Sequence, residues 1–353
     1  MIVEAIRKIV KGKDLSNEEA WKVMSEIMSG GATESQIGAF LTALRMKGET
    51  INEISAFAAV MKRFCRRINP KVSKGLIDTC GTGGDKIKTF NVSTLTALVI
   101  AGAGVPVAKH GNRAVTSRCG SADLLENLGL NLNLEPKEVE EIIEKVGIGF
   151  MFAPKFHPAM KHAIGPRREI GIRTVFNILG PLTNPANPSA QLLGVYSQEL
   201  LEPLAHVLSK LGCQNAMVVH GLDGLDEISI IGKTAAAYLR NGKVTMLEIK
   251  PRDFGFQTAR AEDIQIFSLE ENVEFAFKLL NDLMEPTDPK RKMVLLNAAA
   301  GLFVSGRVDS FHEGIELASL SIESGSAYEK LKEMIKASRG NLTILEELEK
   351  EYA

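Results

Sequence analysis

Several features that would narrow the function of this chain are missing from its sequence. Its 42 Lys and Arg residues are balanced by 43 Asp and Glu residues, and the formal net charge of −1 creates no overall field that attracts nucleic acid or an anionic membrane. None of its apolar runs is long enough to span a bilayer. We therefore expect no nucleic-acid or membrane partner, and any anion must be bound by a local site.

Cysteine is scarce and shows no pattern. The four cysteines, Cys65, Cys80, Cys119 and Cys213, form no Cys-x-x-Cys pair, and no signal peptide is recognisable at the start. These observations favour a reducing compartment and predict a cytoplasmic location.

Two common catalytic motifs are also absent. The sequence contains no Gly-x-Ser-x-Gly elbow for a nucleophilic serine, and its six histidines form no His-Glu-x-x-His zinc pattern. The chemistry must rest on other groups.

The first seventy residues carry helix-start signals instead. Three capping boxes, at Ser16–Glu19, Thr33–Gln36 and Thr50–Glu53, each precede apolar residues at helical spacing. A chain of 353 residues accommodates roughly two domains of about 150 residues each. We predict a small all-helical domain over residues 1–71.

From residue 72 to residue 353 we predict a larger α/β domain. Short apolar strands alternate with helical segments, which is typical of a mostly parallel sheet. Asn241-Gly242 indicates a hairpin that adds at least one antiparallel pair, and helical periodicity returns from about Leu269. Besides one strand that begins near Leu76, the expected strands are Val105–Ala108, Ile148–Phe152, Gln191–Val195 and Ala216–His220.

A glycine-rich loop follows the first strand. Residues 81–85 read Gly-Thr-Gly-Gly-Asp and lead into a polar helix start, where backbone N–H groups favour an anion. The loop lacks the Lys-Ser/Thr of a Walker sequence, and Lys86 stands where a dinucleotide loop needs glycine. It therefore indicates a phosphate site, but not one for ATP or NAD.

A second polar run, residues 109–117, follows the strand Val105–Ala108. Its lysine, arginine, amide and hydroxyl groups suit several phosphate oxygens, although such runs are more often solvated surface. Its place after a strand favours a site, because ligands of open α/β sheets lie beyond the carboxyl ends of the strands.

These motifs, in this order, resemble the anthranilate phosphoribosyltransferase family along essentially the whole chain. The matching runs are residues 81–85, Asn-Val-Ser-Thr at 91–94, Lys-His-Gly-Asn-Arg at 109–113, Asp226-Glu227 and the stretch 167–185. The resemblance implies a type III-like fold of the nucleoside phosphorylase/phosphoribosyltransferase class. It also implies a helical domain that forms a homodimer, with a segment at about 165–190 that packs back on that domain.

The resemblance further implies the reaction. The 5-phosphoribosyl group of 5-phospho-α-D-ribose 1-diphosphate (PRPP) passes to the amine of anthranilate, giving N-(5-phosphoribosyl)anthranilate and pyrophosphate, a step of tryptophan biosynthesis. Such a displacement needs no covalent nucleophile, because positioning and electrostatics suffice. The family uses Mg²⁺, which position matching assigns to Ser93, Asp226 and Glu227. Asp223 is interpreted as surface.

Position matching also assigns the substrate contacts. Anthranilate is assigned to Gly81, Asn112 and Arg167. The residues assigned to PRPP are Gly81, Gly84, Asp85, Thr89, Asn91, Val92, Ser93, Thr94, Lys109, His110, Gly111, Asn112, Arg113, Ala114, Val115, Thr116, Ser117 and Ser121.

Some assignments have a structural alternative. Ser93 suits a metal, but it could equally only cap its helix. Of the neighbours Arg167 and Arg168, which point about 100° apart on a helix, one should face the site, and the family register selects Arg167. His110 is expected to line the aromatic pocket with residues 158–160, or to be a structural histidine.

The remaining features receive structural interpretations. His157, His162, His206 and His312 are expected to be structural. The Gly- and Pro-rich residues 177–185 are expected to form a rigid turn that shapes the site.

Two other functions compete with this one. A pyrimidine nucleoside phosphorylase shares the fold and the glycine loop, but Lys109–Arg113 and Asp226-Glu227 favour a magnesium-diphosphate substrate. A non-catalytic relative that binds nucleic acid is disfavoured by the near-zero net charge, and salt-sensitive DNA binding would revive it.

Overall fold

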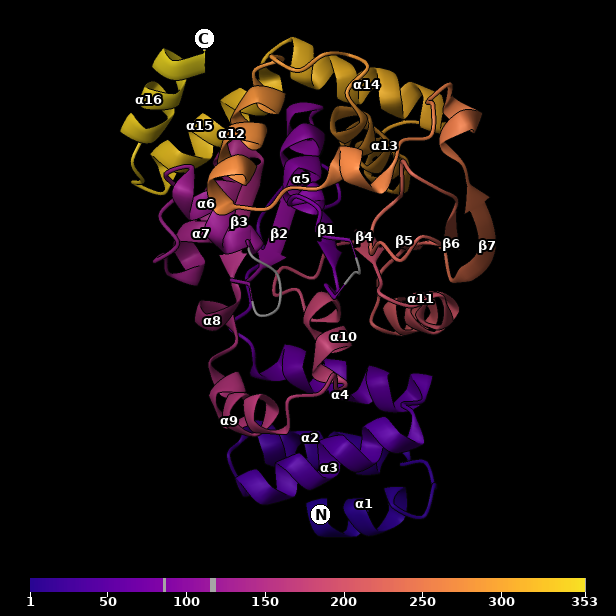
Figure 1. Ribbon diagram of the computed structural model, residues 1–353. Coiled ribbons are helices and arrows are strands. Elements are labelled where there is room, and N and C mark those ends of the chain that lie inside the picture. The colour runs from indigo at the N-terminus through magenta and orange to yellow at the C-terminus, as the bar shows by residue number, and fades with distance from the viewer. Residues whose placement is uncertain (85–86, 115–118, 353) are drawn as a thin grey trace.

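The computed structural model describes residues 1–84, 87–114 and 119–352. The chain begins with a bundle of helices, drawn at the bottom of Figure 1, and continues into a sheet with helices on both faces. The helices before the fourth strand are α1 (Ile2–Ile9), α2 (Asn17–Met28), α3 (Glu34–Lys47), α4 (Ile51–Phe64), α5 (Val92–Gly102), α6 (Ser121–Asn127), α7 (Pro136–Val146), α8 (Ala153–Phe156), α9 (Lys161–Ile170) and α10 (Phe176–Leu182).

The later helices lie mostly on the upper side of the sheet (Figure 1). They are α11 (Leu201–Lys210), α12 (Leu269–Leu280), α13 (Pro289–Val304), α14 (Phe311–Glu323), α15 (Ser326–Ala337) and α16 (Thr343–Tyr352). Short 3₁₀ turns occupy Pro158–Met160, Gln198–Leu200, Pro251–Phe254 and Ala261–Ile264. No helix in the described ranges has the length and apolarity to cross a membrane.

All three predicted capping boxes are present. In α2, α3 and α4 the N-cap hydroxyl accepts the N3 amide proton, and the N3 side chain accepts the N-cap amide proton. The helix α1 was not predicted, because its N-cap is Met1 and no side chain caps it. Its signal is instead an apolar stripe that buries Ile2, Ala5 and Ile9.

The sheet has seven strands in the order β3-β2-β1-β4-β5-β6-β7. The parallel part comprises β3, β2, β1, β4 and β5, and β6 and β7 are antiparallel additions. The mostly parallel sheet is therefore confirmed. Its strands are β1 (Ile77–Gly81), β2 (Val107–Gly111), β3 (Ile148–Phe152), β4 (Ala190–Gly194), β5 (Asn215–Gly221), β6 (Thr234–Arg240) and β7 (Lys243–Ile249).

The predicted hairpin joins β6 to β7. Asn241 and Gly242 both have positive φ, 49° and 81°. Two consecutive residues of this kind make the turn whose twist matches that of the flanking strands.

The prediction of a rigid turn over residues 177–185 is wrong. Residues 176–182 form α10, with Pro181 inside the helix and near its end. Pro181 lacks the N–H that would bond to the Asn177 carbonyl, and burial of Ile178 and Leu179 outweighs this cost. The helix α10 contacts α4 and fills the space between the bundle and the sheet (Figure 1).

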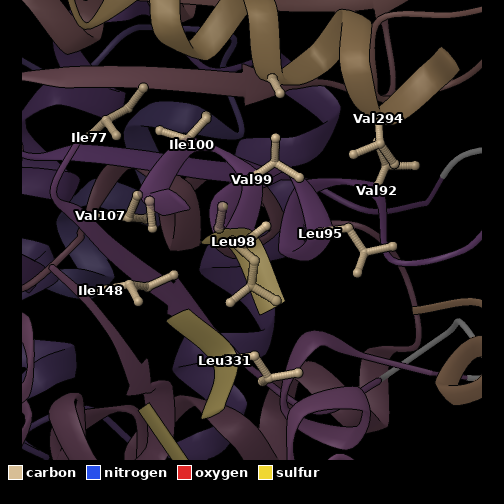
Figure 2. Close-up of a cluster of buried hydrophobic side chains, with 14 of the residues drawn as sticks. Ile77, Val92, Leu95, Leu98, Val99, Ile100, Val107, Ile148, Val294 and Leu331 are labelled. Atoms are coloured by element: carbon tan, nitrogen blue, oxygen red, sulfur yellow. The ribbon is translucent and has the colours of Figure 1, made fainter. Parts of the chain in front are cut away.

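Above the sheet, α5 is buried along almost its whole length. Figure 2 shows Leu98 and Val99 of this helix between Ile77 of β1 and Leu331 of α15. Because α5 is apolar all round, it packs between the strands and α13, α14 and α15. This upper core fixes the start of α5 directly beside the end of β1.

Below the sheet, the bundle does not have a core of its own. A single cluster of buried side chains includes Phe40 and Phe57 of the bundle, Leu179 of α10, Leu204 of α11 and Val218 of β5. Apolar side chains of α10 and α11 therefore cover part of the apolar faces of the bundle helices.

Candidate active site

The sheet places the site where its strand order changes direction. From β1 the chain winds outward to β2 and β3 on one side and to β4 and β5 on the other. Gly81 and Gly194 are register partners at the carboxyl ends of β1 and β4. In open α/β sheets this reversal leaves a crevice in which ligands bind.

The backbone is packed too closely for side chains at these strand ends. A Cβ on Gly194 would lie 1.5 Å from the Asp226 carbonyl oxygen, and one on Gly81 would lie 2.5 Å from Asp226 Oδ2. Gly83 has φ +67° and donates its N–H to Asp226 Oδ2 at 2.7 Å. The glycines thus allow the Asp226 carboxylate to hold the loop after β1.

Two N–H groups of the glycine loop are already used inside the protein. Thr82 donates to Gly194 O at 2.9 Å, and Gly83 donates to Asp226. These two N–H groups therefore hold the loop against β4 and Asp226. On its outer side the loop is held by Arg173, whose Nη2 donates to Gly84 O at 2.8 Å while its guanidinium lies 4.5 Å from the Tyr196 ring centre.

Lys109 is buried in β2, and the alternative interpretation as solvated surface is wrong for it. Its Nζ donates to Thr79 O at 2.7 Å and to Ser93 Oγ at 3.4 Å. Burial lowers the pKa of Lys109, and the nearby Asp78 carboxyl opposes this shift most strongly. The ammonium group therefore lies beside the start of α5.

Ser93 does not cap α5. The helix starts at Val92, its N-cap is Asn91, and no side chain caps it. The alternative that Ser93 caps its helix is wrong. Its hydroxyl oxygen instead accepts a hydrogen bond from Lys109 Nζ.

Asp226 and Glu227 form a buried acidic pair after β5, each 8% exposed. Burial raises the pKa of Asp226, against the hydrogen bond from Gly83. Glu227 is among the acidic groups whose charge opposes the lowering of the Lys109 pKa. Carboxylate and hydroxyl oxygens are hard donors of the kind that Mg²⁺ prefers.

The acidic residues would not enclose a cation by themselves. Within the described ranges, no group of three or more His, Cys, Asp or Glu side chains is placed to hold a metal. This fits Mg²⁺, which keeps few protein carboxylates and takes other oxygens from water and substrate phosphates.

Asp223 is not the surface carboxylate that the sequence indicated. It is half-buried, its Oδ2 accepts the Ser229 hydroxyl proton, and its Oδ1 accepts the Leu225 N–H at 3.2 Å. Asp223 therefore closes the turn that presents Asp226.

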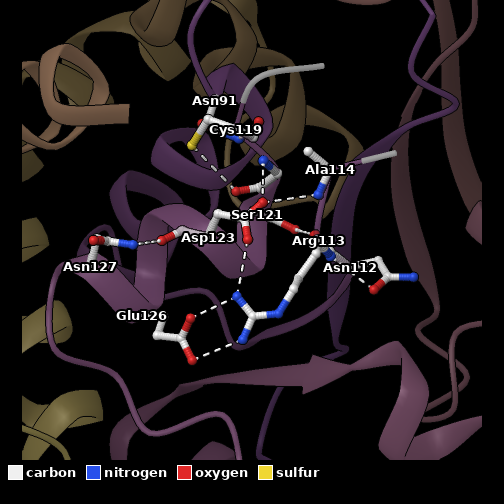
Figure 3. A network of polar contacts seen from close by, with 10 residues as sticks. Asn91, Asn112, Arg113, Ala114, Cys119, Ser121, Asp123, Glu126 and Asn127 are labelled. Carbon is white, nitrogen blue, oxygen red and sulfur yellow. Dashed lines mark hydrogen bonds and ion pairs between the residues drawn. The ribbon is translucent and has the colours of Figure 1, made fainter. Parts of the chain in front are cut away.

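Arg113 points toward carboxylates of the protein. Figure 3 shows its guanidinium on Glu126, at 2.6 and 2.9 Å, and on Asp123 at 3.0 Å. These ion pairs raise the pKa of Arg113, and the group is charged at any relevant pH. In this arrangement Arg113 stabilises the segment that carries it.

The other residues assigned to the substrates differ in how deeply they are buried. The side chain of Val92 is in the upper core, and Thr94 is buried. Asn112 is exposed, and its carbonyl oxygen accepts the Ser121 hydroxyl proton at 3.3 Å. Thr89, Asn91, Gly111 and Ala114 are half-buried, while Asp85, Val115, Thr116 and Ser117 lie outside the described residues.

Two buried histidines face one another near the end of β2. The ring centres of His110 and His157 are 5.0 Å apart, and neither Nε2 has a hydrogen-bond partner within the described ranges. Burial lowers the pKa of both rings, that of His157 to about 4. The pair is therefore neutral at pH 7.

Arg167 and Arg168 differ in exposure. Arg167 is half-buried on α9, with its guanidinium 5.1 Å from the Phe176 ring centre, and Arg168 is exposed. Burial lowers the pKa of Arg167. Within the described ranges no carboxylate forms an ion pair with it.

Sequence reasoning missed two residues of this region. Arg173 lies in the recognised stretch 167–185 but received no role, and Asp123 received none either. Asp123 stands at the third position of α6, the acidic position of a capping box, and that signal could have identified it.

Comparison with known proteins agrees with this architecture. Residues 3–65 match the model of the helical bundle domain of a glycosyl transferase family, and residues 73–328 match the model of its a/b domain. Fold and site therefore define a two-domain glycosyl transferase.

Individual relatives point to one kind of enzyme within this class of glycosyl transferases. An anthranilate phosphoribosyltransferase from Persephonella marina is 52% identical over 342 residues, covering 96% of this chain and 100% of that protein. The crystal structure of the Thermus thermophilus enzyme of that name has a TM-score of 0.89 and 42% identity, covering 95% of this chain and 99% of the other. The structure of the Saccharomyces cerevisiae enzyme in complex with PRPP and Mg has a TM-score of 0.87 and 28% sequence identity, covering 96% of this chain and 98% of the other.

The chain belongs to the anthranilate phosphoribosyltransferase family. The resemblance and the fold class inferred from the sequence are confirmed.

Proposed function

We propose that this chain transfers the 5-phosphoribosyl group of PRPP to the amine of anthranilate and releases pyrophosphate. The observation that carries this proposal lies at the reversal of strand order, in a chain of this family. Asp226 lies against Gly81 at the end of β1, and Lys109 bonds to Thr79 of the same strand and to Ser93. Relatives from S. cerevisiae solved with PRPP and Mg and with 4-fluoroanthranilate support it.

The reaction asks the protein to bind and orient two molecules. The bond from the anomeric carbon to pyrophosphate breaks as the amine forms its own bond to that carbon, through a state with positive charge on the ribose. Lys109 supplies positive charge near the start of α5 for the phosphate groups. Its bond to Thr79 O fixes the ammonium group in advance.

The anthranilate site lies on the side of the helical bundle, whereas PRPP binds on the side of the sheet. Arg167 binds the anthranilate carboxylate, since a guanidinium group matches a carboxylate with two parallel hydrogen bonds. Arg167 lies on α9, which contacts α2 and α3, so the acceptor comes from the bundle side and PRPP from the sheet side. The neutral ring of His110 lines the path between them.

Mg²⁺ is assigned to Ser93, Asp226 and Glu227. When bound, it neutralises charge on the diphosphate of PRPP. The Asp226 carboxylate would then hold both the metal and the glycine loop, through its bond to Gly83.

We further propose a cytoplasmic homodimer that forms through residues 1–71, with residues 72–353 as the PRPP-binding domain and residues 165–190 packed on the bundle. Exposed apolar side chains on the bundle, Val3, Val10 and Met46, support the dimer.

A direct assay tests the activity. The protein is mixed with PRPP, Mg²⁺ and anthranilate, and the loss of anthranilate fluorescence is followed together with pyrophosphate release. We expect equimolar loss and release that requires all three components. Phosphorolysis of a pyrimidine nucleoside, with no loss of anthranilate, would favour the phosphorylase alternative.

A further inference from the structure

One carboxylate oxygen joins both ends of the loop that follows β2. Asp123 Oδ2 accepts the N–H of Ala114 and the N–H of Gly120, each at 2.9 Å (Figure 3). Ala114 belongs to the run of residues 109–117 assigned to PRPP, and Gly120 directly precedes Ser121, which is also assigned to PRPP. A single side chain thus sets the separation of two points of the PRPP-binding segment.

The second oxygen of the same carboxylate holds Arg113. Oδ1 accepts from Arg113 Nη1 at 3.0 Å, and Glu126 binds the other side of the guanidinium group. Burial acts to raise the pKa of Asp123, but the hydrogen bonds from Ala114, Gly120 and Arg113 outweigh it and lower the pKa. Asp123 is therefore ionised at pH 7 and bound by three donors.

Helix capping explains only one of these bonds. Asp123 is the N3 residue of α6, and its bond to the N-cap Gly120 is half of a capping box. Capping requires neither the bond to Ala114 nor the bond to Arg113. Both of these extra bonds reach back into the run of residues assigned to PRPP.

We propose that Asp123 is a positioning residue for PRPP, which acts by holding Ala114, Gly120 and Arg113 in one fixed arrangement. The proposal rests on the proposed function of this segment in PRPP binding. Asp123 itself touches no substrate. Its carboxylate fixes the backbone N–H groups of Ala114 and Gly120 and the guanidinium group of Arg113 before PRPP binds.

The test compares three variants by calorimetric binding of PRPP with Mg²⁺ and by steady-state kinetics. Asp123→Asn keeps the shape but loses the charge and places an NH₂ group against one of the three donors. We expect PRPP affinity to fall about tenfold or more, as for loss of a charged hydrogen bond, with the anthranilate KM little changed. Glu126→Gln, which alters only the Arg113 contact, should change PRPP affinity by less than about fivefold.

A third variant separates positioning from capping. Asp123→Gln supplies the longer acceptor that capping boxes commonly use, so the thermal midpoint should recover toward the unchanged protein. PRPP affinity should stay low, because the longer side chain moves the oxygen away from Ala114.

Two results would overturn the proposal. In the first, Asp123→Asn lowers the thermal midpoint but changes PRPP affinity no more than Glu126→Gln does. Asp123 would then be only a helix cap. In the second, the Asp123→Gln variant recovers both the thermal midpoint and the PRPP affinity of the unchanged protein. The calorimetric measurement of PRPP binding needs no anthranilate. A failure of the proposed anthranilate reaction would therefore appear separately, as PRPP binding without turnover.

Discussion

At the scale of single residues, the charged groups of the site are already engaged inside the protein. Lys109 bonds to Thr79 and Ser93, Arg113 to Asp123 and Glu126, and Asp226 to Gly83. The sequence predicted these residue types, because lysine, arginine and acidic groups after strands suit a phosphate and its metal. It could not predict their partners, since those come from segments up to 143 positions away.

Arg167 and Arg168 provide a test at this scale. Arg167→Ala should raise the KM for anthranilate about 10- to 150-fold, because a bidentate charged contact of about 1.5–3 kcal/mol is lost. The KM for PRPP should change far less. Arg168→Ala, at an exposed position of the same helix, is the matched control and should have little effect. A larger anthranilate defect in Arg168→Ala would show that the register is off by one residue.

The buried His157 ring predicts a pH dependence of stability. Its pKa is about 4 in the folded chain against 6.5 as the ordinary value, so between these values the unfolded chain binds the extra proton. Stability from this group is complete above pH 6.5 and is lost as the pH falls toward 4, by roughly 2 kcal/mol at pH 5.

Urea unfolding at pH 7.5 and pH 5 measures this effect. His157→Gln should reduce the loss of unfolding free energy between the two pH values, and His206→Gln, at an exposed position on α11, should leave the loss unchanged. An equal loss in His157→Gln and in the unchanged protein would contradict the assignment.

At the scale of elements, the three capping boxes look alike in the sequence but differ in what they hold. Glu53 of α4 is fully buried and accepts from Thr50 N, Leu15 N and Lys47 Nζ. Burial acts to lower the pKa of Lys47, but its bonds to Asp14 and Glu53 raise it. Glu19 of α2 caps near the surface and pairs with a half-exposed Lys8.

Substitution should expose this difference. Glu53→Gln should destabilise the chain by about 3 kcal/mol, because it leaves the nearly buried Lys47 with a weaker partner. Glu19→Gln, the same change in the matching box, should cost less than about 1 kcal/mol. Urea unfolding of both variants checks the prediction, and equal losses would show that only the caps matter.

The elements that the sequence predicted are those with local signals. Capping boxes gave α2, α3 and α4, and Asn241-Gly242 gave the β6–β7 hairpin. The helix α10 was missed because its local signal, Gly180-Pro181, points to a turn, and only long-range burial against α4 makes it helical. Asp123 does have a local signal, the acidic position of a capping box, but that signal does not predict its bond to Ala114.

At the scale of the whole molecule, the bundle is completed by the sheet. The helices α10 and α11 lie between the bundle and β4, β5 and β6, and their apolar side chains join one cluster (Figure 1). What remains exposed on the bundle is a set of isolated apolar side chains, with Met46 on α3 84% exposed and Val10 after α1 69% exposed. In the proposed dimer, these residues would contact the second copy.

The dimer is tested by light scattering at micromolar concentration. We expect twice the mass of one chain. Met46→Lys should shift the mass toward that of a monomer, because a charge is then buried without a partner. Leu320→Lys, at an exposed position of α14, should not change the mass. A monomer mass for the unchanged protein would rule out the proposed dimer.

The shared lower core sets a rule for recombining members of this family. The two family models divide the chain between residues 65 and 73. Apolar side chains from both sides of that division nevertheless interdigitate in one cluster, and a bundle taken from a distant relative would meet α10 and α11 with mismatched volumes. The part that can be exchanged as a unit is the bundle with α9, α10 and α11, which is interrupted in sequence and continuous only in the folded chain.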